Sequence, residues 1–272
     1  MIKNTLTIAG VDPSGGAGIL ADIKTMSALG TYATAIIAAL TAQNTQTVSA
    51  VEPVSPAFIA QQIDTLFDDV RIDGVKIGML GQASVIRVVA DKLEKYKPPF
   101  IVLDPVMVAK SQARLLEKEA VSALINELII QSHMITPNLP EAADILQLGS
   151  SPETIKEMYR VAEKLHALLP TKDERWVLLK GGHLPGNDTI DLLFNGDKML
   201  EIEHQKIHTK NTHGTGCSLS SAICALQARF NNVPEATRQA IEYVHQSILH
   251  ADSLSVGSGH GPIHHFHALW SR

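Results

Sequence analysis

The chain has 272 residues, of which 45% are hydrophobic and 19% are charged, and its formal net charge is −5. This length and composition suit one large α/β domain with a sizeable core. The acidic balance, without a Lys/Arg run or an aromatic ladder, argues against nucleic acid as a partner. The apolar run near the N-terminus is too short for a signal peptide or a membrane span, and two cysteines fit a reducing compartment. We therefore expect a cytoplasmic protein that does not bind membranes.

Strands and helices are predicted to alternate along almost the whole chain. The expected strands occupy residues 5–11, 32–43, 74–80, 100–106, 134–137 and 175–182. The expected helices occupy residues 19–29, 55–70, 84–96, 119–129, 139–148, 154–169, 216–229 and 234–254. Residues 189–195 and 198–204 are predicted to form a hairpin around Asn195-Gly196. This order indicates a mostly parallel sheet with helices on both faces, in a single domain over residues 1–272.

Sites in such sheets lie at the carboxyl ends of the strands, so the loops there carry the functional candidates. The first loop, "DPSGGAG" at residues 12–18, is predicted to form the floor of a small-molecule pocket, with Asp22 one helical turn further on. The loop lacks the G-x-G-x-x-G pattern, which argues against NAD. Its candidates for the pocket floor are Asp12, Gly15, Gly16 and Gly18.

The ends of the next strands offer groups that suit a flat heteroaromatic ring. Gln43 and Asn44 end the second strand, and an amide can donate and accept hydrogen bonds at once. Met79 follows "KIG" and provides a soft, adaptable surface for packing on a ring. An ordinary core position remains an alternative for Met79.

The stretch "HGTGC" places Gly214 and Gly216 just before a predicted helix, where backbone N–H groups and the helix dipole can bind an anion. The alternative is a plain tight turn, and the P-loop pattern is absent. Cys217 closes the turn, and a helix start is expected to lower a thiol pKa from about 8.5. Both Cys217 and Cys224 also have an alternative as small apolar fillers, which we favour for Cys224.

Three further loops point to phosphate and metal binding. Asn138 and Glu141 lie three residues apart at a strand-to-helix junction, where their oxygens suit water-mediated Mg²⁺ binding, with helix capping as the alternative. Asp104, at another strand end, adds a second carboxylate. Lys180, also at a strand end, is placed to contact phosphate oxygens, because a buried lysine without a partner is unfavourable.

The C-terminal tail contains His260, His264, His265 and His267. Such a cluster invites a zinc interpretation. No cysteine or carboxylate joins it at ligand spacing, so we do not expect a zinc site.

Taken in order, the loops resemble the ribokinase-like small-molecule kinases, and specifically the hydroxymethylpyrimidine/phosphomethylpyrimidine kinases of thiamine biosynthesis. The matching segments span Leu6 to Phe266 and are "TIAGVDPSGGAGILADIKT", "TAQNT", "KIGML", "LDPVMVAKS", "TPNLPEA", "LKGGH", "NTHGTGCSLSSA" and "GHGPIHHF". The resemblance implies a three-layer α/β/α fold, ATP with Mg²⁺, and phosphorylation of 4-amino-5-hydroxymethyl-2-methylpyrimidine and then of its monophosphate. It also implies a homodimer.

The resemblance assigns roles residue by residue. The expected pyrimidine pocket consists of Gly10, Asp22, Gln43, Met79 and Val106. The expected metal and phosphate region contains Asp104, Asn138 and Glu141. The expected nucleotide contacts are Lys180, Thr212, Gly214, Thr215 and Asn138. Gly214, Gly216 and Cys217, with Lys180, are the expected catalytic group, in which Cys217 is either a base or a part of the anion hole.

One segment departs from the family pattern. The family has "AKSGD" before "LL", whereas this chain has Gln112 and Ala113 in place of Gly-Asp. The segment is expected to be a flap over the phosphates, so the roles of Lys110 and Ser111 in it are open.

Two rival functions share these features. A pyridoxal kinase of the same branch has similar glycine loops, and Gln43 is the residue that favours an aminopyrimidine instead. A non-catalytic ligand sensor is disfavoured because Cys217, Lys180 and Glu141 are all present.

Overall fold

The computed structural model describes residues 1–107, 118–171, 173–184 and 188–270. Within these residues one nine-stranded sheet runs in the order β3-β2-β1-β4-β5-β6-β7-β8-β9. The strands are β1 Asn4–Val11, β2 Tyr32–Gln43, β3 Val48–Pro53, β4 Gly74–Ile77, β5 Ile101–Leu103, β6 Met134–Ile135, β7 Trp176–Leu179, β8 Asp188–Phe194 and β9 Met199–Gln205. The six strands β2-β1-β4-β5-β6-β7 are parallel to one another. The outer strands β3, β8 and β9 pair antiparallel with their neighbours.

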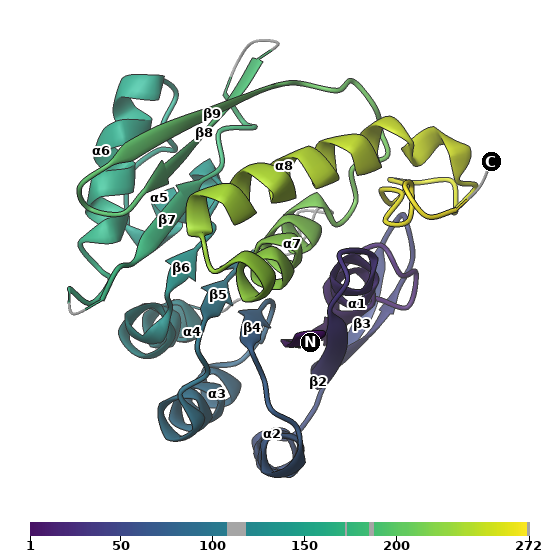
Figure 1. The fold of residues 1–272 in the computed structure, drawn as a ribbon, viewed down its shortest axis with the longest axis vertical. Helices are drawn as coiled ribbons and strands as arrows, with labels where there is room; N and C mark the ends of the chain where they lie inside the picture. Colours follow the sequence, from purple (N-terminus) through teal and green to yellow (C-terminus); the bar gives the residue numbers. More distant parts are fainter. Residues whose placement is uncertain (108–117, 172, 185–187, 271–272) are drawn as a thin grey trace.

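Helices cover both faces of this sheet, as Figure 1 shows. They are α1 Gly18–Ala28, α2 Pro56–Asp69, α3 Ala83–Tyr96, α4 Lys118–Ala123, α5 Leu139–Ile145, α6 Ile155–His166, α7 Thr215–Phe230 and α8 Val233–Leu249. Helices α2 to α6 bury their apolar side chains against one face, and α1, α7 and α8 against the other. The predicted three-layer α/β/α fold is confirmed.

Local sequence signals explain where several helices begin. Ser55 caps α2 by accepting a hydrogen bond from the Phe58 N–H, and a proline follows it directly. Asn138 and Thr154 start α5 and α6 with reciprocal capping boxes. These caps fix the points at which the chain leaves the sheet edge and turns into a helix.

The structure differs from the sequence-based prediction at two elements. Strand β3 was not predicted, because its side chains are mostly exposed and show no apolar alternation. The helix expected at residues 119–129 is interrupted, since α4 is followed by a π-helical turn at Leu124–Leu128 and a 3₁₀ turn at Ile129–Gln131. The predicted β8–β9 hairpin is confirmed.

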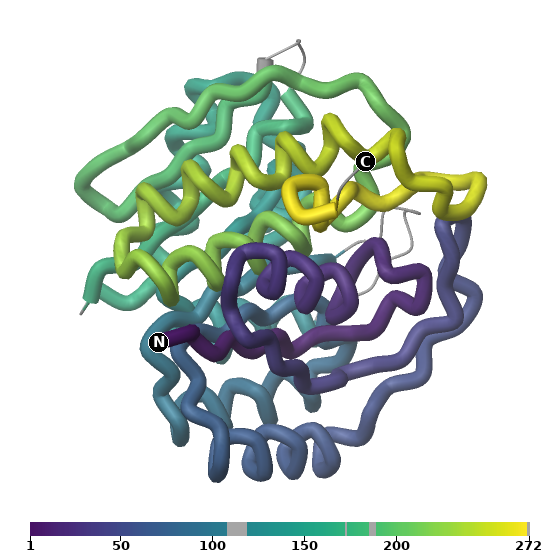
Figure 2. Tube along the Cα trace, turned by 45° about the vertical axis from the view of Figure 1, so that its right-hand side comes forward, coloured from purple at the N-terminus to yellow at the C-terminus, as the bar shows by residue number. Residues whose placement is uncertain are grey.

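The C-terminal tail returns to the N-terminal part of the sheet. Figure 2 shows the last residues, in yellow, beside the turn that joins β2 to β3. The His260 N–H donates to the Thr45 carbonyl oxygen at 2.9 Å, and the Gly259 N–H donates to the Thr45 hydroxyl at 3.1 Å. The tail therefore closes one side of the edge at which the functional loops meet.

In the part of the chain that the structure describes, no helix is both long and apolar enough to cross a membrane.

Candidate active site

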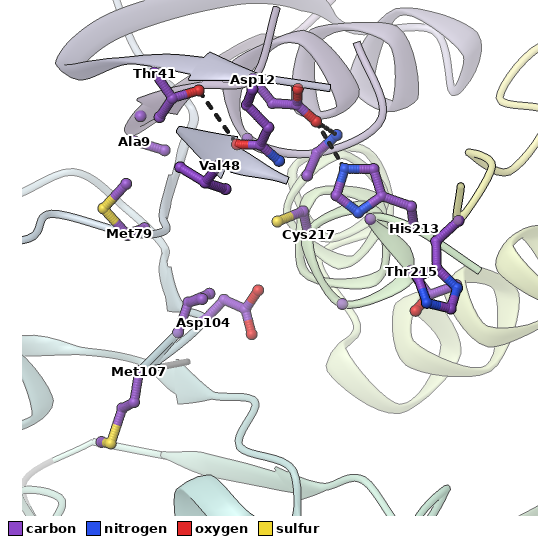
Figure 3. A pocket seen from close by; sticks show the side chains of 18 of the residues that line it. Ala9, Asp12, Thr41, Val48, Met79, Asp104, Met107, His213, Thr215 and Cys217 are labelled. Carbon is purple, nitrogen blue, oxygen red and sulfur yellow. Dashed lines mark hydrogen bonds and ion pairs between the residues drawn. The ribbon is translucent and has the colours of Figure 1, made fainter. Parts of the chain in front are cut away.

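The loops at the carboxyl ends of the strands enclose a cavity of about 760 Å³. Figure 3 shows it between the β1 and β2 ends, the first turn of α7 and the end of β5. Most of the candidates from the sequence line it, namely Gly10, Asp12, Gly18, Gln43, Asn44, Met79, Asp104, Val106, Asn138, Glu141, Lys180, Thr212, Gly214, Thr215, Gly216, Cys217 and His260. Residues from both halves of the sequence thus line the same cavity.

Asp22 lies in a different place from the one expected. It is fully buried and is not among the residues that line the cavity. Its carboxylate forms an ion pair with Lys76 at 2.8 Å beneath the cavity floor. Lys76 itself lines the cavity, and the apolar pattern of its strand gave no signal for this role.

The first turn of α7 is built to receive an anion. Gly214 caps the helix with φ +79°, and a Cβ there would overlap the carbonyl oxygen of Gly16, so only glycine fits. A Cβ at Gly216 would lie 3.5 Å from Lys180 Nζ and 3.8 Å from Asp104 Oδ2. The lysine ammonium thus lies beside the helix start, and both the positive charge and the helix N–H groups favour phosphate.

Cys217 is the third residue of α7, and its sulfur points toward the cavity in Figure 3. Burial raises the pKa of its thiol to about 11, although the Lys76 charge opposes this, and Asp22 and Asp104 add to the rise. The expectation of a lowered thiol pKa is therefore wrong. Desolvation and two nearby carboxylates outweigh the helix start.

Two carboxylates lie next to Lys180 at this end of the cavity. Asp104 is buried and accepts hydrogen bonds from Lys180 Nζ at 3.2 Å and from Thr136 Oγ1 at 3.3 Å. Glu141 caps α5, where its carboxylate accepts from the Asn138 N–H at 2.8 Å. Burial raises the pKa of Glu141 to about 7, Lys180 opposes the rise, and Asp104 adds to it.

These carboxylates fit a magnesium ion. A cation would offset the burial and the Asp104 repulsion that together raise the pKa of Glu141, and Mg²⁺ is commonly held by one or two carboxylates, water and phosphate oxygens. Among the described residues, no group of three or more His, Cys, Asp or Glu side chains is arranged to hold a metal without such help. Asp104 and Glu141 would hold the ion, which would supply positive charge beside the phosphates.

A carboxylate–histidine pair joins two loops of the cavity, and sequence reasoning missed it. Asp12 Oδ2 lies 2.7 Å from His213 Nε2, and the same carboxylate accepts from the Ser14 hydroxyl and the Ala17 N–H. Burial by itself would raise the pKa of Asp12, but these hydrogen bonds outweigh it and the pKa is lowered. His213 directly precedes Gly214, so the pair fixes the anion-binding turn to the β1–α1 loop.

A second cavity of about 810 Å³ adjoins the first. The two share the residues Asn138, Lys180, His183, Thr212, Thr215 and Gly216. Beyond them the second cavity is lined by apolar side chains of α7 and α8, such as Leu219 and Ile241, and by residues 204–210. Two chambers thus meet at the start of α7 beside Lys180.

The tail histidines are divided between the cavity and the core. His260 lines the cavity, whereas His264 and His265 are buried. His265 Nε2 lies 3.1 Å from the Ser218 hydroxyl in the first turns of α7.

The flap residues Lys110, Ser111, Gln112 and Ala113 lie outside the described residues.

Comparison with known proteins gives a consistent answer. The profile of the phosphomethylpyrimidine kinase family matches residues 12–264. The hydroxymethylpyrimidine/phosphomethylpyrimidine kinase of Escherichia coli (strain K12) is 46% identical over 267 residues, which are 98% of this chain and 98% of that protein. The structure of phosphomethylpyrimidine kinase from Clostridium difficile 630 matches with a TM-score of 0.79 and 41% identity, over 90% of this chain and 99% of the other.

A more distant structure matches over more of the chain. The pyridoxal kinase from Staphylococcus aureus, in complex with AMP-PCP and pyridoxal, has a TM-score of 0.88 and 28% identity, over 99% of this chain and 95% of the other. The fold and the site therefore define a small-molecule kinase with a ribokinase-like architecture. Within that class, the chain belongs to the phosphomethylpyrimidine kinase family.

Proposed function

We propose that this enzyme transfers a phosphoryl group from ATP to the hydroxymethyl group of 4-amino-5-hydroxymethyl-2-methylpyrimidine, and then a second one to the resulting monophosphate, in thiamine biosynthesis. The observation that carries the proposal is the pair of cavities that meet beside Lys180 at the start of α7. One chamber is available for the acceptor and the other for the nucleotide. The names of the relatives that share this family support the choice of acceptor.

The lining of the first chamber includes the apolar side chains of Met79 and Val106 and the amide of Gln43. The Gln43 side-chain oxygen accepts a hydrogen bond from the Thr41 hydroxyl at 3.2 Å, which orients the amide. Met79 comes close to Gly10, where a Cβ would lie 2.8 Å from the Met79 methyl group. Met79 and Val106 would then pack on the ring, while the Gln43 amide bonds its polar edge.

The second chamber suits the nucleotide, whose terminal phosphate would reach the shared residues. Asn138, Thr212 and Thr215 would contact the phosphate chain, and Lys180 and the α7 start would neutralise its charge. Phosphoryl transfer depends mainly on positioning and charge stabilisation, so this arrangement supplies what the reaction needs. Bound Mg²⁺, held by Asp104 and Glu141, would add charge neutralisation at the same phosphates.

The proposal is tested with purified protein, Mg-ATP and the hydroxymethylpyrimidine, with pyridoxal assayed in parallel and products identified by mass. We expect both the pyrimidine monophosphate and the pyrophosphate, and no product when EDTA removes Mg²⁺. Turnover of pyridoxal alone would contradict the proposal and would show that Gln43 does not select the ring. Assaying the Gln43→Ala variant with both acceptors tests whether Gln43 determines which acceptor is phosphorylated.

We also propose that the enzyme is a cytoplasmic homodimer and that the chain forms one domain. The resemblance supports the dimer, and Tyr32, Leu40 and Val51 leave apolar surface exposed on the β2–β3 edge of the sheet. Two free cysteines are consistent with a reducing compartment. Light scattering coupled to size exclusion tests the dimer, which a monomer mass at micromolar concentration would rule out.

A further inference from the structure

Beneath the floor of the first cavity lies a buried ion pair. Lys76 Nζ lies 2.9 Å and 2.8 Å from the two carboxylate oxygens of Asp22, and both side chains are 0% exposed. Apolar residues of similar volume often replace buried ion pairs without loss of stability. The demand for a stable fold therefore does not by itself explain this pair.

The Asp22 carboxylate is held from three elements. It accepts a 2.6 Å hydrogen bond from Thr7 on β1 and a 2.7 Å hydrogen bond from Ser221 on α7. Asp22 itself lies on α1, and Lys76 lies on β4. Ser221 follows Cys217 by four residues, which is about one helical turn. The network thus attaches the part of α7 that carries Cys217 to the neighbouring strands β1 and β4.

The Lys76 ammonium is fully buried and needs the room that a glycine leaves beside it. A Cβ at Gly78 would lie 2.8 Å from Lys76 Nζ, so the glycine keeps that position open. Lys76 also lines the cavity wall together with Cys217.

The charged groups that act on the Cys217 thiol are Lys76, Asp22 and Asp104, with the Gly18 N–H as a hydrogen-bond donor. Burial raises the pKa of the thiol, both carboxylates add to this rise, and Lys76 is the charge that lowers it. Lys180 also lies close enough for its own pKa to respond to Cys217. Burial by itself would lower the pKa of Lys76, but Asp22, Cys217 and Asp104 outweigh it and the pKa is raised, so Lys76 carries its charge.

We propose that Lys76 is a positioning residue of the kinase reaction, whose buried ammonium stabilises negative charge on the Cys217 sulfur, and that the Asp22 carboxylate opposes this stabilisation. This inference rests on the proposed kinase function and on the catalytic role that the resemblance implies for Cys217. It reassigns Asp22 from the wall of the substrate pocket to the support beneath it.

The test measures the reactivity of the Cys217 thiol in the enzyme without substrates. Cys224→Ala provides a background in which Cys217 is the remaining cysteine, and its alkylation by iodoacetamide is followed by mass between about pH 8 and pH 11. Lys76→Met is expected to slow alkylation about tenfold near pH 9, because one unit of thiol pKa is one factor of ten in thiolate. Asp22→Asn is expected to accelerate it, because a negative charge is removed while the ammonium stays.

A charge effect slows alkylation in Lys76→Met and accelerates it in Asp22→Asn. A general loosening of the structure would instead accelerate alkylation in both variants. The alkylation rate of the double variant Lys76→Met/Asp22→Asn is expected to lie between the rates of the two single variants. Lys92→Met is the matched control and is expected to leave the alkylation rate unchanged. Unchanged or accelerated labelling in Lys76→Met, with a native circular dichroism spectrum, would overturn the proposal. If Lys76→Met does not fold, slower labelling in Asp22→Asn overturns it instead.

The result does not depend on the identity of the acceptor. An enzyme that failed to phosphorylate the pyrimidine would still report the thiol reactivity, so failure of the proposed function and failure of this inference are separate outcomes.

Discussion

Cys217 lines the first cavity at the start of α7, and burial raises the pKa of its thiol to about 11, so the thiol is protonated at neutral pH. A neutral thiol can still orient a hydroxyl group, and phosphoryl transfer through a loose transition state needs little help from a base. We therefore expect Cys217 to contribute to turnover more than to binding.

We expect Cys217→Ala to lower kcat by about 100-fold, the lower end of the range for positioned proton-transfer groups, and to leave KM for the pyrimidine within about threefold. Steady-state kinetics with the pyrimidine varied at saturating Mg-ATP measures both constants. An unchanged kcat would remove Cys217 from the chemistry.

Gln43 is expected to control recognition of the ring. Gln43→Ala should raise KM for the pyrimidine by about tenfold or more, because it removes a hydrogen-bonding partner from the pocket. Thr41→Val is the matched variant: it keeps the amide but removes the hydroxyl that orients it, and should raise KM by a smaller factor. An unaltered KM in Gln43→Ala would mean that the ring binds elsewhere.

At the scale of the element, the start of α7 contains two glycines that are needed for different reasons. Gly214 has φ +79° and no room for a Cβ, whereas Gly216 lies within the helix and a Cβ there would make ordinary contacts with Lys180 and Asp104. The fold requires the first glycine, and we expect the second to be needed for binding of the ligand.

Gly214→Ala should therefore lower the free energy of unfolding by at least about 1–3 kcal/mol, from the backbone strain alone. Gly216→Ala should leave stability nearly unchanged and instead raise KM for ATP, because its methyl group enters the space between Lys180 and the helix. Thermal unfolding and nucleotide kinetics on the two variants separate these effects. Equal loss of stability in both would contradict the assignment.

The tail is joined to α7 through His265, whose burial, with Lys24 and His264, lowers its pKa from 6.5 to about 3. The folded state thus takes up this proton less readily than the unfolded chain. Stability is fully present above about pH 6.5 and falls as the pH drops toward 3, by up to about 1.4 kcal/mol per pH unit. We expect His265→Asn to flatten the fall in free energy of unfolding between about pH 7 and pH 5, measured by urea denaturation. The same slope in both proteins would assign the acid sensitivity to other groups.

Elements with strong local signals were predictable from the sequence, and elements without them were not. The capped helices and the Asn195-Gly196 hairpin carry their own turn chemistry, so the predicted elements are confirmed there. Strand β3 depends on pairing with β2 and has an exposed surface, which leaves no periodic pattern to detect.

At the scale of the whole molecule, the loops that form the site were predictable because parallel strands bring their carboxyl ends to one edge. The contacts between loops were not, because they join distant parts of the chain. His213 and Asp12 are 201 residues apart, and Lys76 and Asp22 are 54 residues apart. No local pattern in either segment encodes its partner.

The packing of the tail on the β2–β3 turn gives a prediction at this scale. A Cβ at Gly259 would overlap the carbonyl oxygen of Thr45, whereas a Cβ at Gly149 would meet nothing within 4 Å. Gly259→Ala should displace the turn next to Gln43 and raise KM for the pyrimidine by about fivefold or more, since small displacements weaken positioned contacts. Gly149→Ala is the control, with no change in KM. Equal kinetics in both would show that the tail does not shape the pocket.

The order in which the chain leaves the ribosome has a consequence for when activity appears. The nine-stranded sheet is complete once Gln205 has been made, but the cavity still lacks the start of α7 and the residues around His260. A nascent chain therefore contains every strand of the described sheet before it contains the α7 and α8 cover of one face and the residues that complete the cavity. Translation that stops shortly before His260 would release a protein with most of its fold and an open, incompetent pocket.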